Sequence, residues 1–275
     1  MTATTDEAPY DRFAEAYRDW WAPVIAPSAI RVLDQLDGLL PSDQPATVVD
    51  IGAGTGTLAL AALARWPEVR VIGVDPSRRL LEMAMSSARR AGFGDRLTVE
   101  VGEAARLPLP DASVDGAMSS FVIQLIPSRA AGVRDAFRVV RPGGFFACLT
   151  WRAESDEFEP DAAFDDALDA LRISPPTPPG GDGTRPYASP ASAAAELRRA
   201  GFRDVRAGED WLEHRFTPRS YLDLLEHWIE DDTFATLSEP MRERLRSEAL
   251  ERLERLEPGQ LIWRRPLVGV VGRRP

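Results

Sequence analysis

The sequence predicts an α/β fold, in which an open and largely parallel sheet is covered by helices on both faces. Through the first 150 residues, short runs rich in β-branched residues alternate with stretches whose apolar residues recur every three or four positions. The strand-like runs are nearly all apolar, as expected for strands that are buried on both sides. A chain of 275 residues, 44% of them hydrophobic, is large enough to bury such a core.

Five runs of the first part predict strands. They are residues 47–52, 69–75, 96–102, 113–120 and 144–151. Between them, residues 57–66, 78–92 and 130–144 have helical spacing, and the last two of these stretches end in glycines that stop a helix. In a sheet of this kind, ligands bind beyond the carboxyl ends of the strands.

The second part of the chain has a looser pattern. Residues 173–190 are rich in proline and glycine and predict either a lid or a disordered connector. The remaining elements are a helix at 190–202, a strand near 204–211, helices at 217–232 and 238–259, and a last strand at 266–274. The two later helices would form a cap.

Composition excludes several classes of partner and chemistry. A net charge of −10 argues against nucleic acid and anionic membranes and favours a small-molecule partner. No lysine is present, which excludes a lysine Schiff base. Cys148 lies in an apolar run and predicts a buried core residue, and His214 and His227 lack the spacing of metal ligands, so no metal site is expected. The N-terminal sequence has neither a leader pattern nor a membrane span, which predicts a cytoplasmic protein.

The stretch "VVDIGAGTGTLAL" (48–60) predicts a ligand-binding turn between a strand and a helix. A dinucleotide fingerprint needs a small residue at position 57, where this chain has Thr57. Asp50 would repel a pyrophosphate but would attract a cation. The ammonium and sulfonium of S-adenosylmethionine suit that carboxylate, and the carboxylate of the same molecule can meet amides at a helix N-terminus.

Two further acidic positions follow at the ends of later strands. Asp75 ends the second strand and could accept the hydroxyl groups of a ribose, in NAD or in an adenosyl cofactor alike. Glu103 follows the third strand.

With these stretches in view, the sequence resembles the class I S-adenosylmethionine-dependent methyltransferases, in particular the group with the ubiquinone/menaquinone and many small-molecule methyltransferases. The resemblance is carried by "VVDIGAGTG", "GVDPSRRLLEMA", "GEAARLPLPDASVD" and "VVRPGGFF", in family order across residues 46–150. It implies a Rossmann-like, doubly wound sheet of seven strands with the last strand antiparallel, and a helical cap over an acceptor pocket.

The resemblance also implies the residues that bind the cofactor. They are Asp50, Gly52, Ala53, Gly54, Asp75, Pro76, Glu103, Ala104 and Ser119. In the family pattern Asp50, Gly52 and Gly54 border the methionine part, Asp75 holds the ribose, and Glu103 with Ala104 reads the adenine edge. Ser119 would lie near the methionine end.

The acceptor side is less defined by the sequence. The histidine that the family often has after the fourth strand is absent, and Gln124 lies in its neighbourhood. His214 is the candidate base by residue type, while His227 is expected to be solvated among carboxylates. The candidate substrate-binding residues are Tyr17, Trp21, Gln124, Trp151, Tyr187 and His214.

Two other groups of residues have both a structural and a functional interpretation. Tyr10, Phe13, Tyr17, Trp20 and Trp21 form the aromatic face of an N-terminal helix that either packs on the domain or folds over the cofactor, with Tyr17 near the sulfonium as a second catalytic candidate. The acidic run Glu154, Asp156, Glu157, Glu159 and Asp161 is either a solvated face or a recognition site for an amine.

We therefore expect a methyltransferase that acts on an oxygen, nitrogen or carbon of a small organic molecule, as a monomer or homodimer. Its parts would be an N-terminal segment (1–28), a cofactor-binding core (29–150) and the rest of the sheet with the cap (151–275), in one structural domain. The alternatives are a nicotinamide-dependent oxidoreductase and a member that keeps the cofactor pocket but is non-catalytic or non-methylating.

Overall fold

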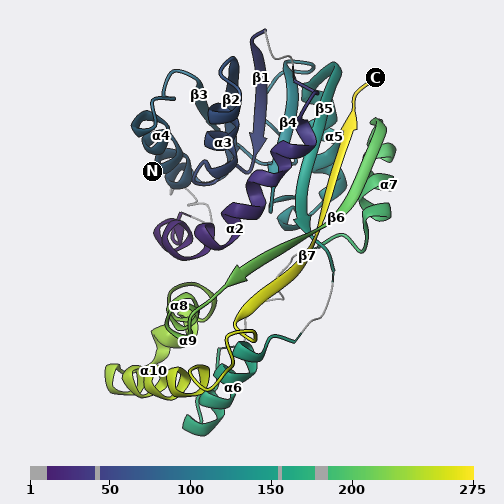
Figure 1. The fold of residues 1–275 in the computed structure, drawn as a ribbon. Coiled ribbons are helices and arrows are strands. Elements are labelled where there is room, and N and C mark those ends of the chain that lie inside the picture. The colour runs from purple at the N-terminus through teal and green to yellow at the C-terminus, as the bar shows by residue number, and fades with distance from the viewer. Residues whose placement is uncertain (1–10, 41–43, 154–156, 177–184) are drawn as a thin grey trace, which may run out of the picture.

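A mixed β-sheet organises the protein (Figure 1). The computed structural model describes residues 11–40, 44–153, 157–176 and 185–275. Within them, seven strands lie in the order β3-β2-β1-β4-β5-β7-β6. The strands are β1 (Ala46–Ile51), β2 (Val69–Asp75), β3 (Leu97–Val101), β4 (Val114–Ser120), β5 (Val140–Trp151), β6 (Arg203–Arg215) and β7 (Ile262–Arg273). β1 to β5 pair in parallel and β7 is antiparallel to both neighbours, which confirms the expected topology.

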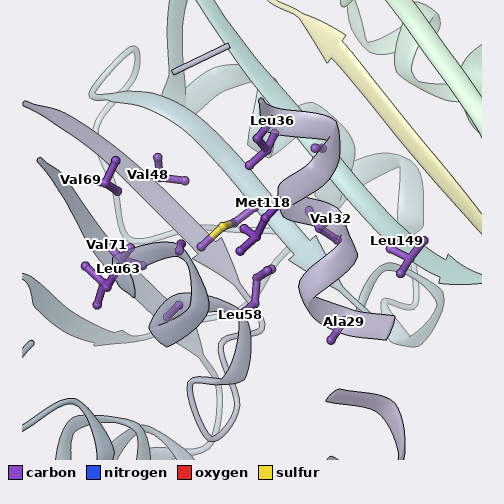
Figure 2. Packing of buried hydrophobic residues seen from close by; sticks show 14 of the residues in the cluster. Ala29, Val32, Leu36, Val48, Leu58, Leu63, Val69, Val71, Met118 and Leu149 are labelled. Atoms are coloured by element: carbon purple, nitrogen blue, oxygen red, sulfur yellow. The ribbon is translucent and has the colours of Figure 1, made fainter. Parts of the chain in front are cut away.

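Helices cover both faces of this sheet. The first face carries α2 (Ala22–Ala29), the 3₁₀ turn η2 (Ile30–Leu36), α3 (Thr57–Arg65) and α4 (Arg78–Arg90), and the second face carries α5 (Arg129–Val139) and α7 (Pro190–Ala200). Adjacent residues of β1 point to opposite faces, so Val48 packs in the first core and Val49 in the second. Figure 2 shows the side chains of Leu36, Leu58 and Met118 in the first core.

Helix α5 ends earlier than predicted. The sequence pattern suggested a helix to residue 144, but the helix stops at Val139 and β5 begins at Val140. Pro142 accounts for this boundary, because a proline disfavours helical backbone in the residue before it and lacks the amide that a helix needs.

The N-terminal segment is helical but irregular. α1 (Ala14–Ala16) leads into a π-helical turn, η1 (Tyr17–Trp21), and then into α2. Tyr10 lies outside the described residues. The π turn matters for the site, because it places three aromatic residues of the segment, Tyr17, Trp20 and Trp21, in one widened turn.

The cap has a hydrophobic core of its own. It consists of α6 (Glu159–Leu171), α8 (Pro218–Leu224), the π-helical turn η4 (Leu225–Ile229), α9 (Asp231–Thr236) and α10 (Glu239–Leu253). Phe164 of α6, Leu225 of η4 and Leu245 of α10 are buried together in a third cluster. Helix α6 was not predicted from the sequence. None of the described helices is long and apolar enough to cross a membrane.

Two strands lead from the sheet to the cap. β5 pairs with β7 as far as Trp151 and Leu267, whereas β6 continues to pair with β7 as far as Arg215 and Ile262. Beyond β5, β6 and β7 therefore form a two-stranded arm, which Figure 1 shows running from the sheet toward α8–α10.

Candidate functional site

A cavity of about 800 Å³ lies at the carboxyl ends of β1 to β4, beneath η1 and η4. This is the edge at which ligands bind in sheets of this kind. Most of the site residues expected from the sequence line it: Tyr17, Trp21, Asp50, Gly52, Ala53, Gly54, Asp75, Pro76, Glu103, Ala104, Gln124 and Trp151. The structure thus brings together residues from the N-terminal segment, the segments at the ends of β1 to β4, and β5.

The glycine turn after β1 is shaped by positive backbone angles. Gly52 has a φ of +74°, and a Cβ there would lie 2.2 Å from Cγ2 of Val122. Gly56, in the left-handed region before α3, would bring a Cβ to 2.9 Å from that of Ala84. Gly56 therefore provides the close helix packing that a dinucleotide fingerprint assigns to position 57, which leaves Thr57 free to line the cavity.

Asp50 presents a buried carboxylate to the cavity. Its side chain is 1% exposed, and its Oδ2 has no hydrogen-bond partner among the described residues. Burial raises the pKa of Asp50 to about 7, against the opposing effect of a backbone hydrogen bond from Ala59. A buried and unpartnered carboxylate oxygen is costly unless a donor or a cation meets it. A cationic group of a ligand would supply that partner.

Asp75 connects the glycine turn to the start of α4. Its Oδ2 accepts a 2.9 Å hydrogen bond from the amide of Gly54, and its Oδ1 accepts one of 2.9 Å from the amide of Ser77. Burial raises the pKa of Asp75, and these two amides oppose the rise. Each oxygen retains a second lone pair, so the carboxylate can still accept hydrogen bonds from a ligand.

The N-terminal segment is fastened beside this carboxylate. Asp11 accepts hydrogen bonds from the Ser77 hydroxyl and from the Arg79 amide, and Glu15 forms an ion pair with Arg79 at 2.6 Å. The ring of Tyr17 then lies over the glycine turn, with a Cβ built on Gly54 only 3.7 Å from its hydroxyl oxygen. The described part of the segment therefore packs over the glycine turn at one side of the cavity.

Five aromatic rings form one wall of the cavity. In order of contact they are Tyr17, Trp228, Trp21, Trp151 and Phe121, with centroid distances of 5.7, 6.3, 6.5 and 4.7 Å between neighbours. We call this set the aromatic wall. It comes from η1, η4, β5 and the loop after β4, and it lines the same cavity as the acidic residues at the strand ends.

Three expected site residues do not line this cavity. Ser119 is fully buried and donates its hydroxyl to the carbonyl of Ile51, and the neighbouring Ser120 lines the cavity instead. Tyr187 is buried in the second core, with the guanidinium of Arg129 4.1 Å from its ring. His214 lies on the arm against Phe216, 4.4 Å between centroids, and burial lowers its pKa. Register and core packing, which decide where a side chain points, account for these misplacements.

Three other candidates have clear surroundings. Gln124, in the 3₁₀ turn η3 (Ile123–Leu125), donates to the carbonyl of Phe121 at 2.7 Å and accepts from Thr150, so its amide positions the loop after β4. His227 is exposed and stacks on Trp20 at 4.4 Å. Glu159 and Asp161 lie in the first turn of α6, where acidic side chains are favourable, and outside the cavity lining; Glu154 and Asp156 fall outside the described residues.

Sequence reasoning missed Phe121, Val122 and Trp228, all of which line the cavity. Trp228 follows Leu224 and Leu225 at helical spacing, which indicates an apolar helix face but not the object it faces. Only the folded chain brings Trp228 to Tyr17, which is more than two hundred residues away in sequence. No group of His, Cys, Asp and Glu within the described ranges could hold a metal ion.

Comparisons with known proteins agree with this geometry. A family model described as "Methyltransferase domain" matches residues 48–144. The chain is 32% identical over 150 residues to a 27-O-demethylrifamycin SV methyltransferase of Amycolatopsis mediterranei, covering 50% of this chain and 55% of that protein. It is 31% identical over 188 residues to a malonyl-[acyl-carrier protein] O-methyltransferase of Geobacter sulfurreducens, covering 67% of each.

The fold also matches solved structures. One is a putative methyltransferase from Bacillus halodurans, with a TM-score of 0.58, 18% identity, and coverage of 90% of this chain and 99% of that one. The chain spans about half the length of the first curated relatives that it matches. From the sheet, the glycine turn and these matches together, the chain belongs to the class I S-adenosylmethionine-dependent methyltransferases.

Proposed function

We propose that this protein transfers a methyl group from S-adenosylmethionine to a small organic molecule. The observation that carries the proposal is the cavity itself, because it joins an unpartnered buried carboxylate oxygen on Asp50 to the aromatic wall. The first end suits a cationic amino acid, and the second suits an apolar acceptor. A nicotinamide cofactor would place a pyrophosphate beside Asp50, where the two negative charges would repel each other.

Each acidic residue of the cavity, and the glycine turn, is suited to one chemical group of the cofactor. Asp50 would receive the ammonium, the turn from Gly52 to Gly54 would border the methionine part, and Asp75 would accept the ribose hydroxyls. Glu103 and Ala104, which follow β3, would meet the adenine edge, with Pro76 beside the ribose.

When bound, S-adenosylmethionine supplies a methyl group on a sulfonium, so that an acceptor lone pair forms the new bond to carbon while the electron pair of the breaking bond stays on sulfur. The protein holds the acceptor in line and excludes water, and both effects lower the barrier. The aromatic wall and the N-terminal segment supply that enclosure. Among the described lining residues there is no histidine, and of the two catalytic candidates only Tyr17 lines the cavity.

Calorimetry with S-adenosylhomocysteine tests the cofactor half of the proposal. The wild-type protein is expected to bind with a Kd on the micromolar order, and Asp75→Ala is expected to weaken binding by at least about tenfold. Asp166→Asn, an exposed carboxylate on α6 outside the cavity lining, is the matched control and should bind as the wild type does. Failure of the wild type to bind would refute the proposal.

A turnover assay tests the second half of the proposal, the transfer of the methyl group to an acceptor. S-adenosylmethionine and a panel of hydroxyl, amine and carbon acceptors are incubated with the protein, and formation of S-adenosylhomocysteine is followed by chromatography. Tight cofactor binding without turnover on any acceptor would favour the non-methylating alternative.

We also propose that the chain works in the cytoplasm as a monomer or homodimer, and that its N-terminal segment (1–28), core (29–150) and capped remainder (151–275) act as one structural domain. The contacts of Trp21 with Trp151, and of Trp151 with Phe121 of the core, support the last point, because together they join all three parts. Sedimentation equilibrium measures the oligomeric state.

A further inference from the structure

The aromatic wall is a continuous surface rather than a scatter of core residues. Trp21 contacts Trp228 nearly parallel, at an interplanar angle of 14°, and also contacts Trp151, whose ring touches Phe121. All of these rings line the cavity, and Trp21, Trp151 and Trp228 remain only half-buried. A face of indole and phenyl rings is therefore exposed to the cavity.

A second layer holds this wall in place. Trp263 of β7 packs 5.9 Å from Trp21 and 5.8 Å from Trp151, measured between ring centroids, and is not among the lining residues. The rings are thus supported from behind, and their orientation does not depend on a ligand. A preformed wall of this kind reduces the entropy that binding must overcome.

The charged side chains of the cavity lining come from elements other than those of the aromatic wall. The ionisable carboxylates of the lining are Asp50, Asp75 and Glu103, at the ends of β1, β2 and beyond β3. No arginine or histidine of the described residues lines the cavity, so an anionic acceptor would find no ion pair there. The acidic residues of α6 also lie outside the lining and cannot hold an amine.

Building on the proposed function, we propose that the acceptor is a planar, uncharged, conjugated molecule that stacks on the aromatic wall, and that Trp228 is its specificity-determining residue. Stacked rings gain stabilisation beyond the burial of their area, and that gain is available only to a flat π system. Trp228 is the lining residue that the cap supplies among the described residues, so it contacts the acceptor from the side opposite the sheet.

Binding to the complex with S-adenosylhomocysteine tests this inference without turnover. The probes are 2-naphthol, its saturated counterpart decahydro-2-naphthol, and cyclohexylmethylamine, titrated by calorimetry into protein already saturated with S-adenosylhomocysteine. We expect 2-naphthol to bind about tenfold more tightly than either other probe. Equal binding of the saturated alcohol, or tighter binding of the amine, would overturn the inference.

Two tryptophan variants test whether the aromatic wall causes the preference for 2-naphthol. Trp228→Leu is expected to lower the affinity for 2-naphthol about tenfold and to leave that for S-adenosylhomocysteine unchanged. Trp211→Leu removes an exposed indole of β6 outside the cavity and should change neither. An equal loss of both affinities in Trp228→Leu would contradict a role in acceptor choice.

If Trp228→Leu does not fold, as judged by circular dichroism, Phe121→Leu at the other end of the wall replaces it with the same expected result. The two proposals fail in different ways. Absence of S-adenosylhomocysteine binding refutes the proposed function, whereas normal binding of it without preference for 2-naphthol refutes only the stacking acceptor.

Discussion

At the scale of single residues, Asp50 links the site to pH. Burial raises its pKa to about 7, so near neutral pH the ligand-free protein holds a mixture of the charged and neutral carboxyl. The ammonium of a bound cofactor favours the charged form. Affinity should therefore rise with pH as the ligand-free carboxyl ionises.

The first prediction is a rise of about tenfold in affinity for S-adenosylhomocysteine between pH 6 and pH 8. Calorimetry at several pH values measures it. Asp50→Asn should bind more weakly at pH 8 and show a much flatter profile, because its side chain does not titrate. A variant profile as steep as that of the wild type would assign the pH dependence to another group.

The raised pKa of Asp50 also predicts how the stability of the protein changes with pH. Because the folded pKa of Asp50 lies above the unfolded value, its contribution to stability is fully present below the unfolded pKa and is lost as pH rises through about 7. Between pH 5 and pH 8, Asp50→Asn should gain roughly 2 to 3 kcal/mol of unfolding free energy relative to the wild type. Urea denaturation without ligand measures this difference, and a constant difference across that range would contradict it.

Some residues of the site could be predicted from the sequence, and others could not. Asp50, Gly52 and Asp75 belong to short motifs at strand ends, and the parallel sheet brings such ends together, so they could be predicted. Trp228 could not, because its position depends on the packing of the cap against η1. The misplacement of Tyr187 has the same origin, since the backbone of that residue pairs with Trp151 and directs its ring into the second core.

At the scale of elements, the turn between β1 and α3 requires glycine at position 52. Gly52→Ala would place a methyl group on a backbone of positive φ and against Val122. We expect a loss of about 1 to 3 kcal/mol in unfolding free energy and of measurable S-adenosylhomocysteine binding. Thermal denaturation and calorimetry measure the two effects.

Two further variants separate the causes at this turn. Gly208→Ala, in β6 where an added Cβ meets nothing within 4 Å, is the control and should bind normally. Adding Val122→Ala to Gly52→Ala removes the two closest contacts, those with the Cγ atoms, but leaves the Cβ of residue 122 at 2.9 Å and the backbone strain in place, so it should recover only part of the stability. Full recovery would show that the φ angle is unimportant.

Elements whose apolar residues recur at a regular spacing were predictable. Elements whose conformation depends on packing against other parts of the chain were not. The apolar strands β1 and β2 and the helices α3 and α4 follow their sequence patterns closely. The π-helical turns η1 and η4 look like ordinary helix in the sequence, and their contact through Tyr17 and Trp228 joins residues far apart in the chain. Helix α6 was hidden by its acidic residues, which stabilise its first turn but obscure its apolar face.

At the scale of the whole molecule, the cap has a hydrophobic cluster of its own, which the two-stranded arm and the N-terminal segment connect to the sheet. A small core with few connections opens more often than a large one. We expect amide hydrogens of α8–α10 to exchange faster than those of α3 and α5, as measured by hydrogen–deuterium exchange with mass spectrometry. Uniform exchange across these helices would show that cap and sheet open together.

Ligand binding should reveal how the parts are coupled. With S-adenosylhomocysteine and 2-naphthol both present, exchange should slow in η1 and η4 together, because Trp21 and Trp228 contact each other across the cavity. Protection of η1 alone would mean that the cap does not take part in binding.

At the far end of the arm, the end of β6 and the start of β7 lie next to each other. The amide of Phe216, just after β6, donates a 2.9 Å hydrogen bond to the carbonyl of Leu261, just before β7. Residues 217–260 therefore form a cassette whose two ends meet, and exchanging it leaves the register of both strands intact. Exchange of this segment, at two junctions that are neighbours in space, would replace Trp228 and α8–α10 while leaving Asp50, the glycine turn and Asp75 in place.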